Sequence, residues 1–127
     1  MSTYSTDQDL VPVYFPDAAA MPDQLAPLHE AAGAQIGRDL TAQGWDADDL
    51  AALSEATLAA LIVPSCAYVM HLIFRSQSSR GGGPELLDLA KYWQGEYVRA
   101  LASTAIETTL PDDADPPATR GGYVVLG

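Results

Sequence analysis

Apolar positions recur with helical spacing over much of the chain. From residue 25 to residue 40, apolar residues follow one another at intervals of three or four, which places them on one face of a helix. These positions are Leu25, Leu28, Ala32, Ile36 and Leu40. Pro27 fits only the first turn of such a helix, and Gly44 is a natural stop. We therefore expect a helix from residue 23 or 24 to residue 43.

The next apolar stretch is almost continuous. Residues 56–74 form a run of 19 positions without a formal charge. We expect a central helix over residues 55–77 that the other helices cover, with Pro64 kinking it or dividing it into two segments. The run is also close to the length that spans a bilayer, so a membrane helix is the alternative. Polar residues within the run and amphipathic neighbours on both sides favour the core helix.

A second amphipathic pattern occupies residues 84–103. Pro84 is suited to a first helical position, and the Gly-rich segment of residues 76–83 before it predicts a turn. The predicted buried stripe consists of Leu86, Ala90, Trp93, Tyr97 and Leu101. Two short elements complete the set: a turn that Thr6 caps, with Asp9 at its third position, and a helix that Asp46 caps and that runs to Leu53.

The C-terminal segment differs from this helical body. Residues 104–127 are polar and Pro-rich, and they end in the strand-like patch Tyr123, Val124, Val125 and Leu126. Such a segment buries too little apolar surface to fold alone, so we expect it to order against something else. The sequence thus predicts an all-α bundle of about four to five helices over residues 1–103, followed by an extended arm that ends in a short β-strand.

The charge is strongly acidic and uneven. The chain carries a formal net charge of −11 at pH 7. Residues 1–53 contain nine acidic residues against Arg38, whereas acidic and basic residues balance over residues 54–103. An acidic surface argues against tight binding to nucleic acid, because affinity for phosphate comes from Lys and Arg. It suits a surface that DNA passes, or one that docks on a basic partner.

No pattern of catalytic, cofactor-binding or metal-binding residues is recognisable in the sequence. We expect His71 to be a core residue with one hydrogen bond, and His29, beside Glu30, to face solvent. Cys66 lies in the apolar run and is expected to act as a small core hydrophobe. The aspartates at 46, 48 and 49 are better explained by helix capping than by a calcium loop. We expect a protein that is not an enzyme and needs no cofactor.

The order of these parts resembles one family of structural proteins. The segments YSTDQDL, LHEAAGAQIGRDL, LIVPSCAYVMHLIFRS and LLDLAKYWQGEYVRAL follow one another as they do in the head–tail connector, or adaptor, proteins of long-tailed phages and related particles. Those proteins are small and helical and assemble as a ring, typically twelvefold, beneath the portal. The resemblance covers residues 4–103 and carries no catalytic residues.

This resemblance implies a virion protein at the head–tail junction. It implies a homo-oligomeric ring, a portal partner, a tail-side neck partner, a channel through which DNA passes without tight binding, and no membrane. Asp46, Asp48 and Asp49 are then candidates for an acidic face of the channel, and residues 123–126 for partner docking by strand addition. The alternative is a small acidic inhibitor or interaction module that binds a basic partner or mimics nucleic acid.

Overall fold

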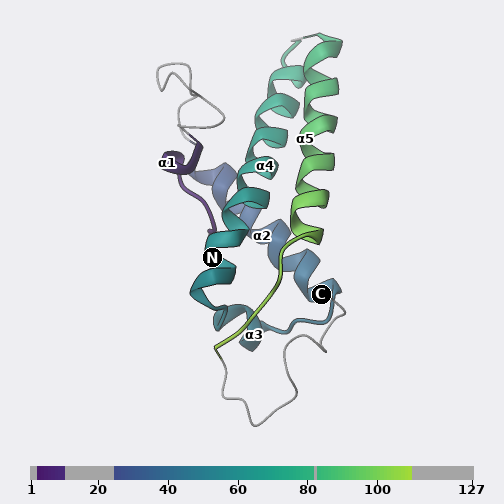
Figure 1. The fold of residues 1–127 in the computed structure, drawn as a ribbon. Helices are drawn as coiled ribbons and strands as arrows, with labels where there is room; N and C mark the ends of the chain where they lie inside the picture. Colours follow the sequence, from purple (N-terminus) through teal and green to yellow (C-terminus); the bar gives the residue numbers. More distant parts are fainter. Residues whose placement is uncertain (1–2, 11–24, 82, 110–127) are drawn as a thin grey trace.

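The computed structural model describes residues 3–10, 25–81 and 83–109, and in these ranges the predicted all-α fold is confirmed. The helices are α1 (Asp7–Leu10), α2 (Ala26–Ala42), α3 (Ala47–Ala51), α4 (Glu55–Ser79) and α5 (Pro84–Ala102). In Figure 1, α4 and α5 run side by side as an antiparallel hairpin, α2 crosses behind them, and α3 lies at the lower end. The predicted terminal strand, residues 123–126, lies outside the described residues.

Local sequence sets the ends of the helices as predicted. Pro27 lies in the first turn of α2, and Gly44 takes a φ of 107° just beyond its end, a conformation that favours glycine. Pro84 begins α5. Asp46 caps α3, because its carboxylate accepts a hydrogen bond from the backbone N–H of Asp49. These signals act within a few residues, which is why the sequence alone reveals them.

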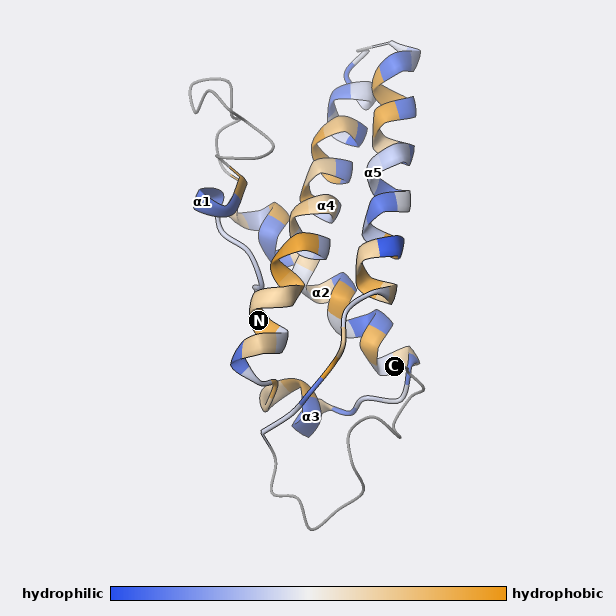
Figure 2. Ribbon diagram, viewed as in Figure 1, coloured by the Kyte–Doolittle hydropathy of each residue, from blue (hydrophilic) through white to orange (hydrophobic). Residues whose placement is uncertain are grey.

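The central helix is one helix of 25 residues that runs through Pro64. Of the two effects predicted for Pro64, a kink or a division into two segments, the division does not occur. The prediction that the other helices cover it holds for the middle of the helix, where residues 64–73 are all buried or partly buried. In the first half the described neighbours leave Leu58 and Val63 exposed, at 42% and 56% of their surface. Figure 2 shows hydrophobic residues along most of α4, with hydrophilic residues at its upper end.

Two hydrophobic clusters make up the core. The first joins α2, the α3 region, α4 and α5, and it contains Ile36, Leu40, Trp45, Leu53, Leu61, Ala67, Tyr97 and Leu101. The second joins α1, the start of α2 and the later part of α4, and it contains Leu10, Leu25, Ala32, Cys66, Val69, Met70 and Ile73. The predicted stripe of α2 supplies both clusters and that of α5 supplies the first, although Leu28, Leu86 and Trp93 are only partly buried. Because α4 contributes to both clusters, it is the central helix of the bundle.

The first part of the C-terminal segment returns along the body. Thr108 pairs with Leu53 in an isolated antiparallel bridge. The Glu107 carbonyl accepts from the Ser54 N–H at 2.9 Å, and the Glu107 N–H donates to the Thr57 hydroxyl at 2.9 Å. Figure 1 shows this stretch running from the end of α5 down to α3. Residues 104–109 are therefore ordered by their own body, whereas the sequence suggested that the whole segment from residue 104 needs another surface.

Candidate functional site

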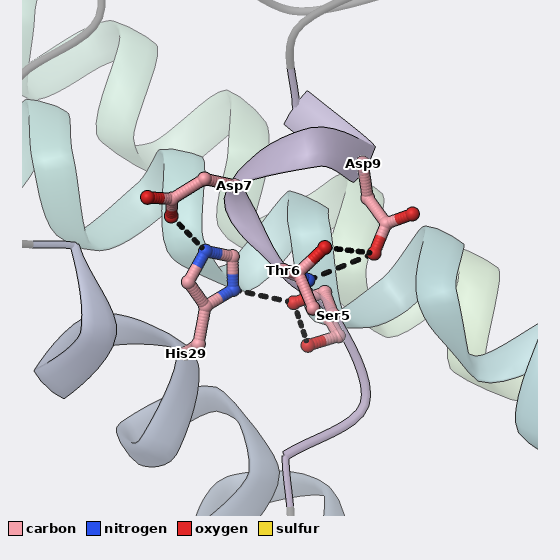
Figure 3. Close-up of polar contacts among 6 residues, drawn as sticks. Ser5, Thr6, Asp7, Asp9 and His29 are labelled. Carbon is pink, nitrogen blue, oxygen red and sulfur yellow. Dashed lines mark hydrogen bonds and ion pairs between the residues drawn. The ribbon is translucent and has the colours of Figure 1, made fainter.

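The most developed polar cluster in the described residues ties the N-terminal segment to two helices. The Ser5 hydroxyl lies 2.7 Å from Nδ1 of His29 on α2 and 2.7 Å from the Ser65 hydroxyl on α4. Nε2 of the same ring lies 3.0 Å from a carboxylate oxygen of Asp7. Figure 3 shows the histidine ring between Ser5 and Asp7. The cluster joins positions that are up to 60 residues apart in the sequence.

Each of these groups has a consistent hydrogen-bonding role. A carboxylate can only accept, so Nε2 of His29 donates to Asp7. When the ring is neutral, Nδ1 is then an acceptor and the Ser5 hydroxyl donates to it. Ser5 in turn accepts from the Ser65 hydroxyl. Every buried polar side-chain atom of this chain of contacts thus has a partner, which is what a stable buried network requires.

The prediction that His29 faces solvent is wrong. Its surface is only 4% exposed, because the N-terminal segment covers it. A signal was present in the sequence: His29 lies four residues after Leu25 and three before Ala32, so it belongs to the apolar stripe of α2. His71 behaves as predicted, since it is buried and its Nδ1 lies 2.8 Å from the Ala90 carbonyl oxygen.

Serine, histidine and aspartate together invite comparison with a hydrolase triad, but the arrangement is inverted. In a hydrolase the serine faces the substrate and the aspartate is buried. Here Ser5 is 3% exposed and already bonded to Ser65, while the side chain of Asp7 is 51% exposed. The cluster therefore acts as a tether that holds residues 3–10 on the bundle, and its geometry does not present a nucleophile.

Two shallow clefts flank the N-terminal segment. One, of about 410 Å³, is lined by residues of this segment and the start of α2, among them Asp7, His29 and Glu30. The other, of about 350 Å³, has an apolar wall formed by Leu58, Ala59 and Ile62 of α4. Within the described residues there is no group of three His, Cys, Asp or Glu side chains that could hold a metal ion.

The three aspartates predicted for an acidic face divide into two kinds. Asp46 and Asp48 are exposed. Asp49 is only 1% exposed, because its carboxylate accepts from the Asp46 N–H at 3.0 Å while its own N–H donates to Asp46. This reciprocal capping box confirms that capping explains Asp46 and Asp49. Within this fold, only Asp46 and Asp48 of the three lie on the surface.

The two most strongly perturbed side chains are held in their neutral forms. Burial, reinforced by the charge of Asp9, raises the pKa of the Cys66 thiol to about 12, so Cys66 is the inert core residue that the sequence predicted. Burial raises the pKa of Tyr97, whose hydroxyl donates to the Asp39 carboxylate at 2.5 Å. Both groups strengthen the core and neither is placed for chemistry.

Several large apolar side chains remain on the surface of α4 and α5. They are between 40% and 60% exposed and comprise Leu58, Val63, Leu87, Leu89, Tyr92 and Val98. By length and composition α4 is also apolar enough to cross a membrane, although slightly more than half of its most apolar window is buried inside the bundle. The docking residues predicted at 123–126 lie outside the described residues.

No family model, curated protein or solved structure matches this chain in the comparisons with known proteins.

Proposed function

We propose that this chain is a structural subunit of a head–tail connector, in a phage or a phage-like particle, that assembles as a ring beneath the portal. The observation that carries the proposal is the set of exposed large apolar side chains on α4 and α5. The body already has two core clusters, so these side chains are not needed to fold it. Large apolar side chains left exposed along two helices favour burial against another protein.

The charge supports the same function. The exposed Asp46 caps α3 and the exposed Asp48 belongs to it, in an N-terminal part that is strongly acidic. Figure 1 shows α3 at the lower end of the body. A channel for DNA benefits from repulsion, and tight binding would require Lys or Arg side chains that neutralise the phosphates and release the counterions of the DNA. In this proposal DNA passes the ring without tight binding, and portal and tail-side proteins are the partners.

The proposal is tested on particles and on the isolated chain. Mass spectrometry of purified particles should detect the chain in a fixed ratio to the portal protein, and electron microscopy should place it as a ring at the head–tail junction. Particles made without the chain should lack joined tails. Absence from particles, together with tight capture of a basic protein, would favour the acidic inhibitor instead.

DNA binding supplies an independent measurement. Fluorescence anisotropy should show no binding of duplex DNA by the unmodified chain at moderate salt. Tight binding under these conditions would contradict the channel role. Membrane fractions that retain the chain after a carbonate wash would instead support the membrane helix.

A further inference from the structure

A second stripe follows the outer surface of α5, about 100° around the helix from its buried stripe. Its residues recur at intervals of three or four and all are exposed: Pro84, Leu87, Lys91, Gly95, Val98 and Ala102. We name this set the α5 stripe. A Cβ placed on Gly95 would meet nothing within 4 Å, so the space beside it is open to another backbone. Lys91 is the only formal charge in the stripe.

A matching stripe lies on the first half of α4. Ala56, Ala59, Ala60 and Val63 are exposed and carry no polar side chain; we name them the α4 stripe. Val63 is two residues from Leu61, which is fully buried in the cluster shared with Tyr97 and Leu101 of α5. A step of two residues corresponds to a rotation of about 200° around the helix axis, so the α4 stripe faces away from α5. Its three alanines allow a neighbouring helix to approach closely.

We propose that the α4 stripe of one copy packs against the α5 stripe of the next copy. This inference rests on the proposed function and names the contact that would close the ring. Both stripes belong to one chain and face in different directions, which is the arrangement that a head-to-tail interface requires. Small residues on one stripe receive the larger Leu87 and Val98 of the other, as in ridge-and-groove helix packing.

Charge favours this pairing over a symmetric dimer. Lys91 lies near the middle of the α5 stripe, so two α5 stripes related by a two-fold axis would bring their ammonium groups together. The α4 stripe instead begins beside the exposed Glu55, and Asp9 lines the adjacent cleft. Pairing unlike stripes therefore places the one cation of the two stripes near acidic side chains.

The test uses one arginine on each stripe. Val63→Arg and Val98→Arg change side chains that are 56% and 60% exposed, so circular dichroism should show that both variants fold. In sedimentation or native mass spectrometry at the highest soluble concentration, the wild-type chain should self-associate. The dissociation constant of self-association should be at least about thirtyfold higher for each variant, which is the effect of losing one interface hot spot. Thr41→Arg, an exposed position at the end of α2 and outside both stripes, is the control and should associate like the wild type.

Mixing the two variants gives the decisive result. Each variant retains one intact stripe, so an equimolar mixture should form a heterodimer and stop there, whereas the double variant should stay monomeric in every mixture. The inference is overturned if the wild type stays monomeric, if either single variant still assembles normally, or if the mixture does not pair. Assembly through these stripes without incorporation into particles would refute the proposed function alone. A particle-bound ring that tolerates both substitutions would refute this interface alone.

Discussion

Replacing His29 by alanine tests the tether between the N-terminal segment and the bundle. The substitution removes a contact of 2.7 Å to Ser5 and one of 3.0 Å to Asp7. A buried hydrogen bond contributes about 1 kcal/mol net, and the bond to the half-exposed Asp7 lies at the lower end of that scale because water screens it. The substitution also leaves a cavity where the buried ring was. The lost hydrogen bonds and the cavity together should lower the free energy of unfolding by about 2 to 3 kcal/mol.

The measurement is urea unfolding followed by tryptophan fluorescence, with a lower midpoint and an unchanged slope. Glu30→Ala is the matched control, since Glu30 is the next residue and is exposed, and it should change stability by less than about 0.5 kcal/mol. A double-mutant cycle with Ser5→Ala should reveal a coupling energy of about 1 kcal/mol. If His29→Ala costs no more than the Glu30 control, the tether does not exist in solution.

Three further predictions concern the core and the C-terminal segment. Tyr97→Phe removes the hydroxyl that donates to Asp39 and should lower the free energy of unfolding by about 1 to 2 kcal/mol; a change near zero would contradict this bond. Removing residues 110–127 should leave the melting temperature nearly unchanged, whereas removing residues 104–127 should lower it. Only the longer deletion breaks the contacts with Leu53, Ser54 and Thr57. Equal melting temperatures of the two truncated proteins would refute the docking of residues 104–109 on the body. The pKa of the Cys66 thiol rises from 9.0 in the unfolded chain to about 12 in the folded protein, so the unfolded chain releases the thiol proton at lower pH. The contribution of this thiol to the free energy of unfolding should therefore be complete below pH 9 and fall as the pH rises toward 12. Cys66→Ala should reduce that fall in urea titrations at a series of pH values, and an identical decline in both proteins would exclude the thiol as a cause.

The sequence by itself determined most of the helical framework. Pro27, Pro84 and Gly44 mark helix ends because a missing N–H or a positive φ acts on the chain locally. Asp46 was identifiable as a cap for the same reason. The apolar stripe of α2 predicted its buried face, because helical periodicity relates neighbours only three or four residues apart. The assignment of Cys66 and His71 to the core also followed from the apolar run around them.

Only the tertiary structure decided how the elements cover one another. His29 is buried because the N-terminal segment covers it: Ser5 and Asp7 contact its ring from positions 24 and 22 residues away in the sequence, and no local pattern indicates these contacts. The same holds for the first half of α4, which is more exposed than the middle of the helix: its residues are as apolar as those that follow, so composition could not distinguish them. Asp49 was correctly identified with capping but not as a buried carboxylate. Burial depends on which distant segments arrive at a surface, whereas helix formation depends mainly on neighbours along the chain, and this difference explains what the sequence left open.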